Sequence, residues 1–198
     1  MALLAALLQA KPDTTYPRLR SLTPQQTLAD LHRLFPEGRD HSDLIPVPPD
    51  EIPEPYRQLL VHTHHMTVTV EGFYGQAVNV KVLDRVRSEM TYGRKILLSL
   101  KESGDVVQFG VIEVNLAALS DTVRKEIIAE KTPLGRVLIQ NNVLRSISPL
   151  QFYRVTPWPQ LCEWFGLKAP RVTYGRLGII YAGDHPAIEV LEILAPIG

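Results

Sequence analysis

The sequence predicts an α+β fold, a single domain in which helices pack on a mainly antiparallel sheet. Segment 78–82 alternates polar and apolar residues, which is the period of a strand with one buried face, and 92–100 and 106–114 are two further candidate strands. A turn sequence at 102–105 separates two of these segments, as in a hairpin. Short turns favour antiparallel pairing, because parallel strands need long crossover connections.

The N-terminal part predicts a helix followed by a proline-rich wrap. A capping box with proline at the first helical position indicates a helix over 24–35. The prolines between 45 and 55 exclude a helix or a central strand, so we expect an ordered wrap rather than a linker. One domain is therefore expected over 1–198, with the helix and wrap over 1–57 and the sheet and ligand cavity over 58–198.

The remaining segments complete the expected fold. Alternation also predicts strands over 66–71, 172–181 and 187–196. Ser120 is a typical N-cap, and short helices are expected over 120–129, around 131–136 and within 157–166.

The composition excludes several classes of partner. Lysine plus arginine equals aspartate plus glutamate, at 21 each, so no overall field attracts nucleic acid or an anionic membrane. No stretch reaches the ~18 consecutive apolar residues of a membrane span. The apolar residues 3–8 follow no basic residue, which favours a short amphipathic helix or a frayed terminus over a signal peptide. With Cys162 as its single cysteine, the chain forms no internal disulfide, and we expect a cytoplasmic protein.

Glu192 interrupts the apolar face of the last predicted strand. Alternation places it on one face with Ile188, Val190 and Leu194. A buried carboxylate needs a partner, a ligand or a proton. Glu192 is therefore a candidate general acid.

Arg94 is the candidate partner of this carboxylate. Alternation over 92–100 groups Arg94 with apolar side chains, whereas Lys95 and Ser99 take the opposite face. A guanidinium can hold a carboxylate through two parallel hydrogen bonds. Arg94 could therefore clamp an anionic substrate beside Glu192, or the two side chains could form a structural ion pair, and the pattern leaves both open.

Four short motifs carry a family resemblance. They are Met66-Thr67, Arg94-Lys95-Ile96-Leu97-Leu98, Lys131-Thr132-Pro133-Leu134-Gly135-Arg136, and Glu192 with Pro196 four residues later. In this order they resemble the Met-Thr, Arg-Glu-Ile-Leu-Leu, Lys-Thr-Pro-Leu-Gly-Arg and Glu-Leu-Phe-Leu-Pro motifs of the chorismate pyruvate-lyase family. The resemblance covers roughly residues 56–196.

The resemblance implies a fold and a reaction. Members of the family have a six-stranded antiparallel sheet with helices and flap-like segments around a buried ligand, and they release pyruvate from chorismate to leave 4-hydroxybenzoate without a cofactor. It implies that Arg94 grips a carboxylate, that Glu192 is the general acid, and that backbone groups of Met66 and Leu134 contact the ligand. A protonated glutamate would neutralise the charge on the departing enolpyruvate, and aromatisation of the ring would drive the reaction.

Three histidines before Met66 depart from the family pattern. On a strand, His62 and His64 would share a face, a spacing that can bind a metal. No cluster of carboxylates or cysteines accompanies them, so no metal site is predicted. His62, His64 and His65 are instead candidates for pocket lining or for surface positions, and in a pocket they could change the substrate or add a base.

Other polar residues have weaker patterns. Cys162 lies in an apolar setting typical of an inert core cysteine, and Glu71 is expected to be solvated. Four arginines could supply a second anion contact, and the sequence does not rank them: Arg145, Arg154, Arg171 and Arg176.

Two classes of function remain. The leading hypothesis is a lyase of the chorismate type, with a small carboxylate as substrate and no cofactor. The same fold could act on another cyclic carboxylic acid, or it could bind a small molecule without catalysis, like the effector domains of some transcription regulators. The residues before the resemblance are proline-rich and not basic, so we expect no binding of nucleic acid or membrane.

Overall fold

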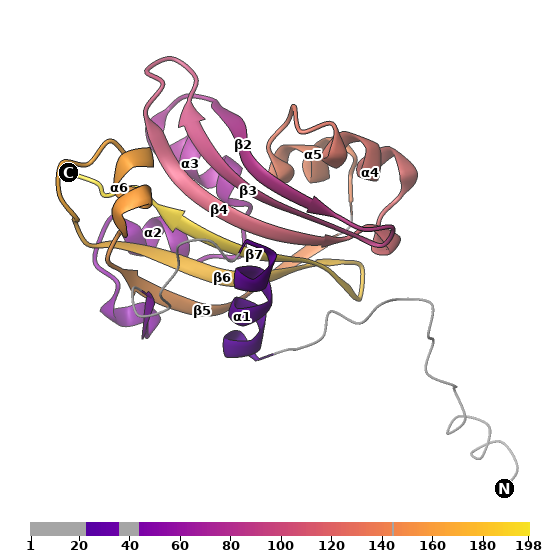
Figure 1. Ribbon diagram of the computed structural model, residues 1–198, viewed down its shortest axis with the longest axis horizontal. Helices are drawn as coiled ribbons and strands as arrows, with labels where there is room; N and C mark the ends of the chain where they lie inside the picture. The colour runs from indigo at the N-terminus through magenta and orange to yellow at the C-terminus, as the bar shows by residue number, and fades with distance from the viewer. Residues whose placement is uncertain (1–22, 36–43, 144) are drawn as a thin grey trace, which may run out of the picture.

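The computed structural model describes residues 23–35, 44–143 and 145–198, which form an antiparallel sheet with helices on both faces (Figure 1). This arrangement confirms the predicted α+β class. The expectation for residues 3–8 lies outside the described residues. No helix in the described part of the chain is long and apolar enough to cross a membrane.

The sheet has seven strands in the order β1-β5-β6-β7-β4-β3-β2, and every neighbouring pair is antiparallel. The strands are β1 (Leu44–Val47), β2 (Val78–Arg87), β3 (Thr91–Leu100), β4 (Val106–Asn115), β5 (Arg145–Val155), β6 (Thr173–Ala182) and β7 (His185–Leu194). The resemblance implied six strands. The seventh is β1, a four-residue strand that lies at the sheet edge, the place where a proline-containing strand can pair.

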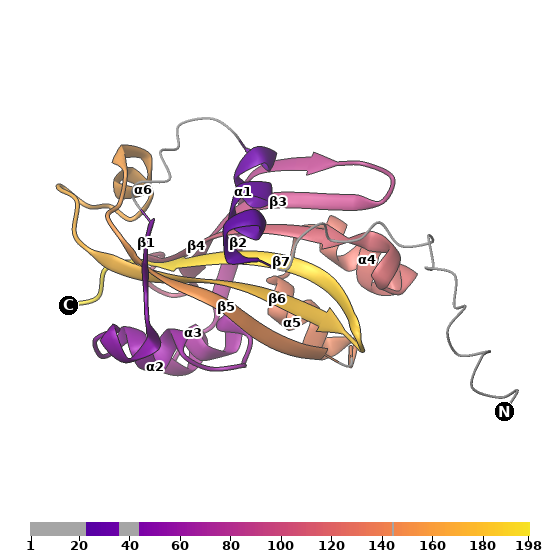
Figure 2. The same ribbon diagram turned by 90° about the horizontal axis from the view of Figure 1, so that it is seen from below.

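The helices divide between the two faces of the sheet (Figure 2). One face carries α2 (Tyr56–Leu60), α3 (Met66–Tyr74), α4 (Asp121–Ile128) and α5 (Leu134–Gln140), and the other carries α1 (Pro24–Leu34) and α6 (Pro159–Trp164). Two short 3-10 turns, η2 (Pro49–Glu51) and η3 (Leu116–Ala118), complete the described elements.

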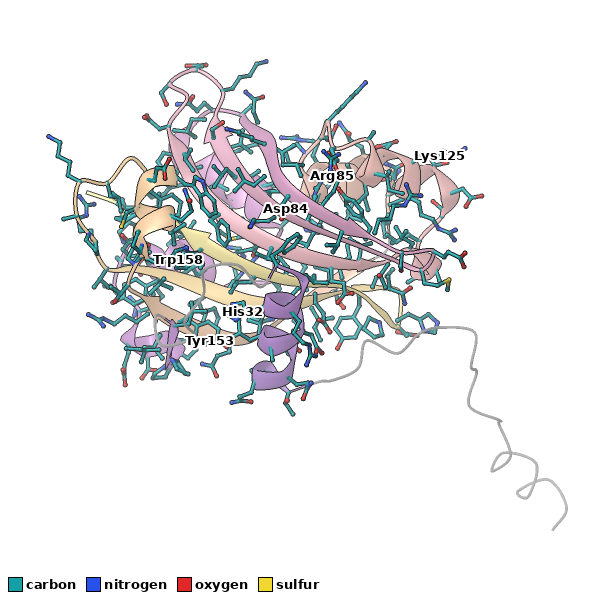
Figure 3. All side chains as sticks on the ribbon, viewed as in Figure 1. His32, Asp84, Arg85, Lys125, Tyr153 and Trp158 are labelled. Carbon is teal, nitrogen blue, oxygen red and sulfur yellow. The ribbon has the colours of Figure 1, made fainter. Side chains whose placement is uncertain are left out.

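The face under α1 and α6 is a packed core with aromatic contacts. The Thr23 hydroxyl accepts from the Gln26 backbone N–H, which confirms the predicted cap of α1. Phe109 of β4 stacks on Trp164 and meets the edge of Trp158, a residue labelled in Figure 3. The functional candidates lie on the other side of the sheet.

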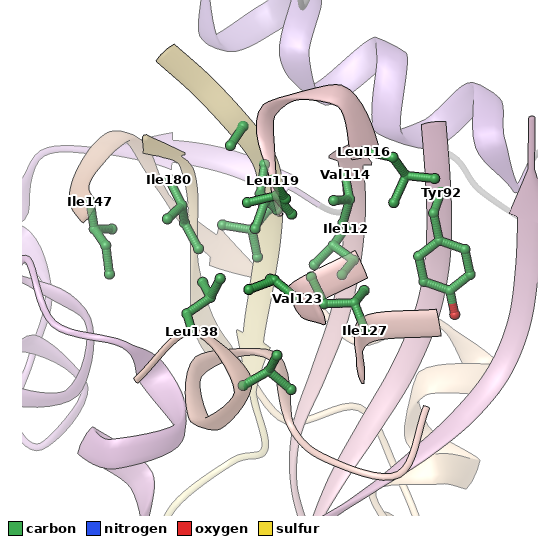
Figure 4. Close-up of a cluster of buried hydrophobic side chains, with 14 residues drawn as sticks. Tyr92, Ile112, Val114, Leu116, Leu119, Val123, Ile127, Leu138, Ile147 and Ile180 are labelled. Carbon is green, nitrogen blue, oxygen red and sulfur yellow. The ribbon is translucent and has the colours of Figure 1, made fainter. Parts of the chain in front are cut away.

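Two apolar clusters cover the opposite face. The first, shown in Figure 4, joins α4 and α5 to the sheet and includes Ile112, Ile127 and Leu138. The second joins α2 and α3 to the sheet and includes Leu60, Met66 and Leu98. The space where the two clusters meet is the candidate site.

The predicted strand over 66–71 is wrong, because these residues form helix α3. Met66, Thr67 and Val70 are buried, which is helical spacing, and Gly75 ends the helix in the left-handed conformation. A six-residue alternating window fits either period when its polar residues are threonines, and the tertiary contacts decide the outcome. Conversely, the sequence pattern predicts no strand over 145–155, yet these residues form β5. Pro149 lies at a bulge of this strand.

Candidate functional site

A narrow chamber lies between the sheet and the helices α3 and α5. Its free volume is about 40 Å³, which is room for about three water molecules. Its floor comes from β2, β3, β4, β6 and β7, and its cover comes from the first turns of α3 and α5. The lining residues are His65, Met66, Thr67, Val80, Arg94, Ile96, Leu98, Gln108, Gly110, Ile112, Pro133, Leu134, Gly135, Ile180, Val190 and Glu192.

Arg94 places a guanidinium in this chamber without a carboxylate against it. The side chain is 1% exposed, and its Nη1 donates a long bond of 3.4 Å to the Ile127 carbonyl. The Nε atom is buried and has no partner, and no carboxylate of the described residues lies within ion-pair distance. Burial lowers the pKa of Arg94, and the nearby Tyr92 and Glu130 oppose that effect. Arg94 is therefore a buried cation whose hydrogen-bonding capacity is only partly used.

Glu130 braces the outer side of the Arg94 site. It accepts a 2.6 Å bond from the Tyr92 hydroxyl and forms a 2.8 Å ion pair with Arg85, which Figure 3 labels. Burial and the bond to Glu130 raise the pKa of Tyr92 to about 12, so this hydroxyl stays protonated. These contacts fix the connection between α4 and α5 over the sheet. Burial lowers the pKa of Arg94 and the Glu130 charge opposes this effect, but the two groups form no ion pair.

Glu192 lies on the same chamber wall but pairs with a different arginine. Arg176, directly opposite it on β6, donates from Nε to Glu192 Oε2 at 2.7 Å, and both residues are buried. The hypothesis of a structural ion pair between Arg94 and Glu192 is therefore wrong. No hydrogen bond from a described residue reaches Glu192 Oε1, which leaves one carboxylate oxygen for a ligand.

Arg176 also holds the loop between α2 and α3. Its Nη1 donates to the carbonyls of Leu60 at 3.2 Å and His62 at 3.0 Å, and its Nη2 donates to the His64 carbonyl at 3.1 Å. One buried guanidinium thus connects Glu192 to the loop that leads into Met66. The loop position and the Glu192 orientation depend on the same side chain.

His62 is fixed in one neutral tautomer by this loop. The predicted strand face shared with His64 is wrong, since both residues lie in the loop, where their rings stack at 5.4 Å. His62 Nε2 lies 2.7 Å from the Leu59 carbonyl, so it carries the hydrogen. Nδ1 then accepts from the His64 N–H and faces Arg176 at 3.3 Å. A proton on Nδ1 would face the His64 N–H and the Arg176 guanidinium, which are both donors. Burial and the Arg176 charge therefore lower the pKa of His62 to about 4.

We expect loop closure to weaken as the pH falls from about 6.5 to about 4. In the open loop His62 regains its ordinary pKa of about 6.5 and binds a proton, whereas the closed loop excludes it down to about pH 4. Closure is thus fully favourable above 6.5 and is lost as the pH falls through the window. The protection of residues 61–65 against hydrogen exchange, taken relative to the intrinsic rate at each pH, should fall in this range in the wild type and much less in His62→Gln.

The control for this pH dependence must separate the effect of His62 on the loop from the effect of Glu189 on global stability, which has the opposite sign. Glu189, on the other face of the sheet, has a pKa raised to about 7 by burial and by Glu113. Its contribution to global stability grows as the pH falls, which is the opposite sign. Exchange in the loop is therefore compared between the wild type, His62→Gln and the exposed His185→Gln. Equal pH dependence in all three proteins would contradict the role of His62.

The other two histidines occupy different positions. His65 lines the chamber and also a wider outer groove of about 570 Å³, whereas His64 lines only the groove. The groove runs between the loop before α3 and the end of α5, where Ile139 and Asn142 form its other side. His65 therefore lies between the outer groove and the chamber, and His62 lines neither space.

The seam between α3 and α5 closes the chamber. A side-chain carbon at Gly135 would lie 2.9 Å from both His65 Cβ and Thr67 Oγ1, so only glycine allows this approach. Glu71 of α3, which was expected to be solvated, pairs with Arg136 of α5. Met66 and Leu134 begin the two helices and line the chamber on either side of the seam.

The sequence pattern does not single out two further residues, one behind Glu192 and one in the chamber. Arg176 was one of four unranked arginines, because the simple register of the β6–β7 hairpin does not place it opposite Glu192. Counting back from the turn at 183–184 puts Glu192 opposite residue 175, and a one-residue bulge shifts the partner to Arg176. The other is Gln108, a buried amide on β4.

Comparisons with known proteins give only weak likenesses. No protein-family model and no curated protein matches the chain. Among solved structures, PhnF from Mycobacterium smegmatis is 11% identical with a TM-score of 0.48, over 84% of this chain and 93% of that chain. The C-terminal domain of the histidine utilization repressor from Pseudomonas syringae pv. tomato is 12% identical with a TM-score of 0.42, over 60% of this chain and 91% of that domain. YydK from Bacillus subtilis is 11% identical with a TM-score of 0.44, over 59% of this chain and 57% of YydK. TM-scores this low carry no argument, so the site is interpreted from its own geometry.

Proposed function

We propose that this protein binds a small carboxylic acid in the chamber between α3 and α5. The observation that carries the proposal is Arg94, a cation that is 1% exposed, faces the chamber and has no described carboxylate within ion-pair distance. A buried charge without a counter-ion costs stability. A carboxylate ligand would remove that cost by supplying the missing charge and the acceptor for Nε.

The size of the chamber limits how the acid binds. A volume of about 40 Å³ holds about three waters and no six-membered ring. The cover must therefore move outward when a ring-sized acid binds. The parts of the cover that can separate are the two helix starts at the seam, because they belong to different apolar clusters.

A second candidate function is elimination of pyruvate from chorismate, and Glu192 favours it. Its free Oε1 lies on the wall of the chamber that contains Arg94. Glu192, held in place by its ion pair with Arg176, is assigned first the role of proton acceptor and then that of proton donor. The order of proton transfers therefore differs from the general-acid role first expected.

The steps balance with Glu192 as the only proton carrier. The Glu192 carboxylate takes the ring hydrogen as a proton, the electrons of that C–H bond complete the aromatic ring, and the C–O bond to the enolpyruvyl group breaks. The proton on Glu192 then passes to the methylene carbon of enolpyruvate, which gives pyruvate. Arg94 holds the ring carboxylate throughout, and exclusion of water keeps the proton on this path.

Replacing Glu192 with glutamine separates the two functions. The amide oxygen of the new side chain can still accept from Arg176 Nε, so the fold and acid binding should be retained. If the protein is a lyase, pyruvate release from chorismate should fall by about 10²–10⁴-fold, the usual contribution of a positioned acid–base group. Pyruvate is measured with a coupled dehydrogenase, and binding by thermal stabilisation with added acid.

Three results distinguish the outcomes. Turnover by the wild type that survives in Glu192→Gln contradicts the lyase mechanism. Thermal stabilisation by an acid without any pyruvate release supports a binding protein that is not a lyase. Stabilisation that is unchanged in Arg94→Met contradicts the proposed anion site itself.

A further inference from the structure

Gln108 is a buried amide in an apolar part of the chamber. It is 3% exposed, and in the sheet it lies between Leu98 on β3 and Leu194 on β7. Its Oε1 is buried and has no hydrogen-bond partner, although the residue lines the chamber. An unsatisfied buried carbonyl costs stability, and an apolar side chain would pack against both leucines without that cost.

We propose that Gln108 determines the specificity of the chamber by accepting a hydrogen bond from a donor group on the bound acid. The inference rests on the proposed function, because Arg94 supplies the contact for the anionic end. Arg94 Nε and Gln108 Oε1 are the two chamber atoms of the described residues that are buried without a partner, one a donor and one an acceptor. A ligand that satisfies both atoms carries an acceptor at one end and a donor at the other.

The strand register sets the two contacts apart. Arg94 is opposite Ile112, and Gln108 lies four residues before Ile112 on β4. Four strand residues separate the backbone positions by about 13 Å, and the two long side chains shorten the gap between their polar ends. Gly110 lies midway between them and carries no side chain, so the floor of the chamber is shallow there. A side-chain carbon at this position would lie 3.4 Å from Ile96.

The class of ligand follows from this layout. It is an elongated acid with one carboxylate at the Arg94 end, an apolar middle over Gly110, and a hydroxyl or amine at the Gln108 end. An acceptor without a hydrogen, such as an ether oxygen, would face the Gln108 carbonyl oxygen unfavourably. The Gln108 oxygen therefore selects the donor over an otherwise matched acid.

The test uses three matched probes: benzoate, its para-hydroxy derivative and its para-methoxy derivative. In the wild type we expect the hydroxy acid to bind about tenfold more tightly than the other two, the effect of one satisfied buried acceptor. In Gln108→Met, which keeps the length of the side chain, the three affinities should become equal within about twofold. Gln25→Leu, at an exposed position of α1, should keep the wild-type order.

Titration calorimetry with these proteins separates the possible failures. Binding that depends on Arg94 but shows the same preference in the wild type, Gln108→Met and Gln108→Leu overturns the role of Gln108 and leaves the proposed function standing. Absence of binding by all three acids overturns both. Loss of the preference with retained benzoate affinity supports the inference and also shows that the variant is folded.

Discussion

Replacing Arg94 with methionine should stabilise the empty protein and abolish its binding of acids. Methionine removes a buried charge that has no carboxylate of the described residues within ion-pair distance, and it fills similar volume beside the lining residues Ile96, Ile112 and Leu134. Replacing buried ionic groups with well-packed apolar ones stabilises proteins by about 1–4 kcal/mol, and we expect a gain in this range. For a chain of this size the gain corresponds to about 2–4 °C in Tm per kcal/mol.

The surroundings of Arg94 tolerate this change. The Ile127 carbonyl that loses the Arg94 contact still accepts from the Glu130 N–H at 3.2 Å. Tyr92 and Arg85 continue to hold Glu130. The substitution therefore creates no new unsatisfied group among these neighbours.

Thermal unfolding with and without added acid measures both effects at once. The control is Arg57→Met, which removes an exposed arginine paired with Glu54 and should change stability by less than about 0.5 kcal/mol. A clear loss of stability in Arg94→Met would show that Arg94 is structural. If that variant binds acids with wild-type affinity, Arg94 is not the anion site.

The sheet could be predicted from the sequence because its central strands follow a simple local rule. Alternation identifies β3, β4, β6 and β7, and it places Arg94 and Glu192 on inward faces before any contact is known. The segment at Met66 is misread because its period is ambiguous over six residues, and helix packing decides it. Local pattern thus identifies the central strands, but it fails for the short segment at the seam and for β5, which Pro149 interrupts.

The partners inside the chamber could not be predicted, because they depend on register. Alternation shows that Glu192 needs a partner but not which arginine reaches it. Arg176 takes that role from the neighbouring strand β6, whereas Arg94 lies on β3, beyond β4, and has no carboxylate of the described residues within ion-pair distance. The distinction between a structural pair and a binding cation therefore depends on strand order and register, which the local pattern of one segment does not contain.

Replacing Arg176 with methionine should be among the most destabilising single changes in the chain. It leaves Glu192 as a buried carboxylate without a partner, and it removes the guanidinium donors to the carbonyls of His62 and His64. The Leu60 carbonyl keeps the His62 N–H at 3.0 Å. Removing one member of a buried ion pair costs about 3–5 kcal/mol, and we expect a loss of this size in denaturant unfolding.

A double-mutant cycle with Glu192→Gln divides that loss into its two parts. The second substitution removes the stranded charge, so Arg176→Met should cost about 1–3 kcal/mol less in the Glu192→Gln background. The remaining cost belongs to the loop, and faster hydrogen exchange of residues 61–65 should accompany it. The exposed pair Arg57–Glu54, at 2.9 Å, is the matched control and should give a coupling below about 1 kcal/mol.

If the cycle at Arg176 gives no larger coupling than this control, the buried pair does not hold Glu192. If the coupling is large but loop exchange is unchanged, Arg176 orients Glu192 without closing the chamber, and the loop must be fixed by its own contacts.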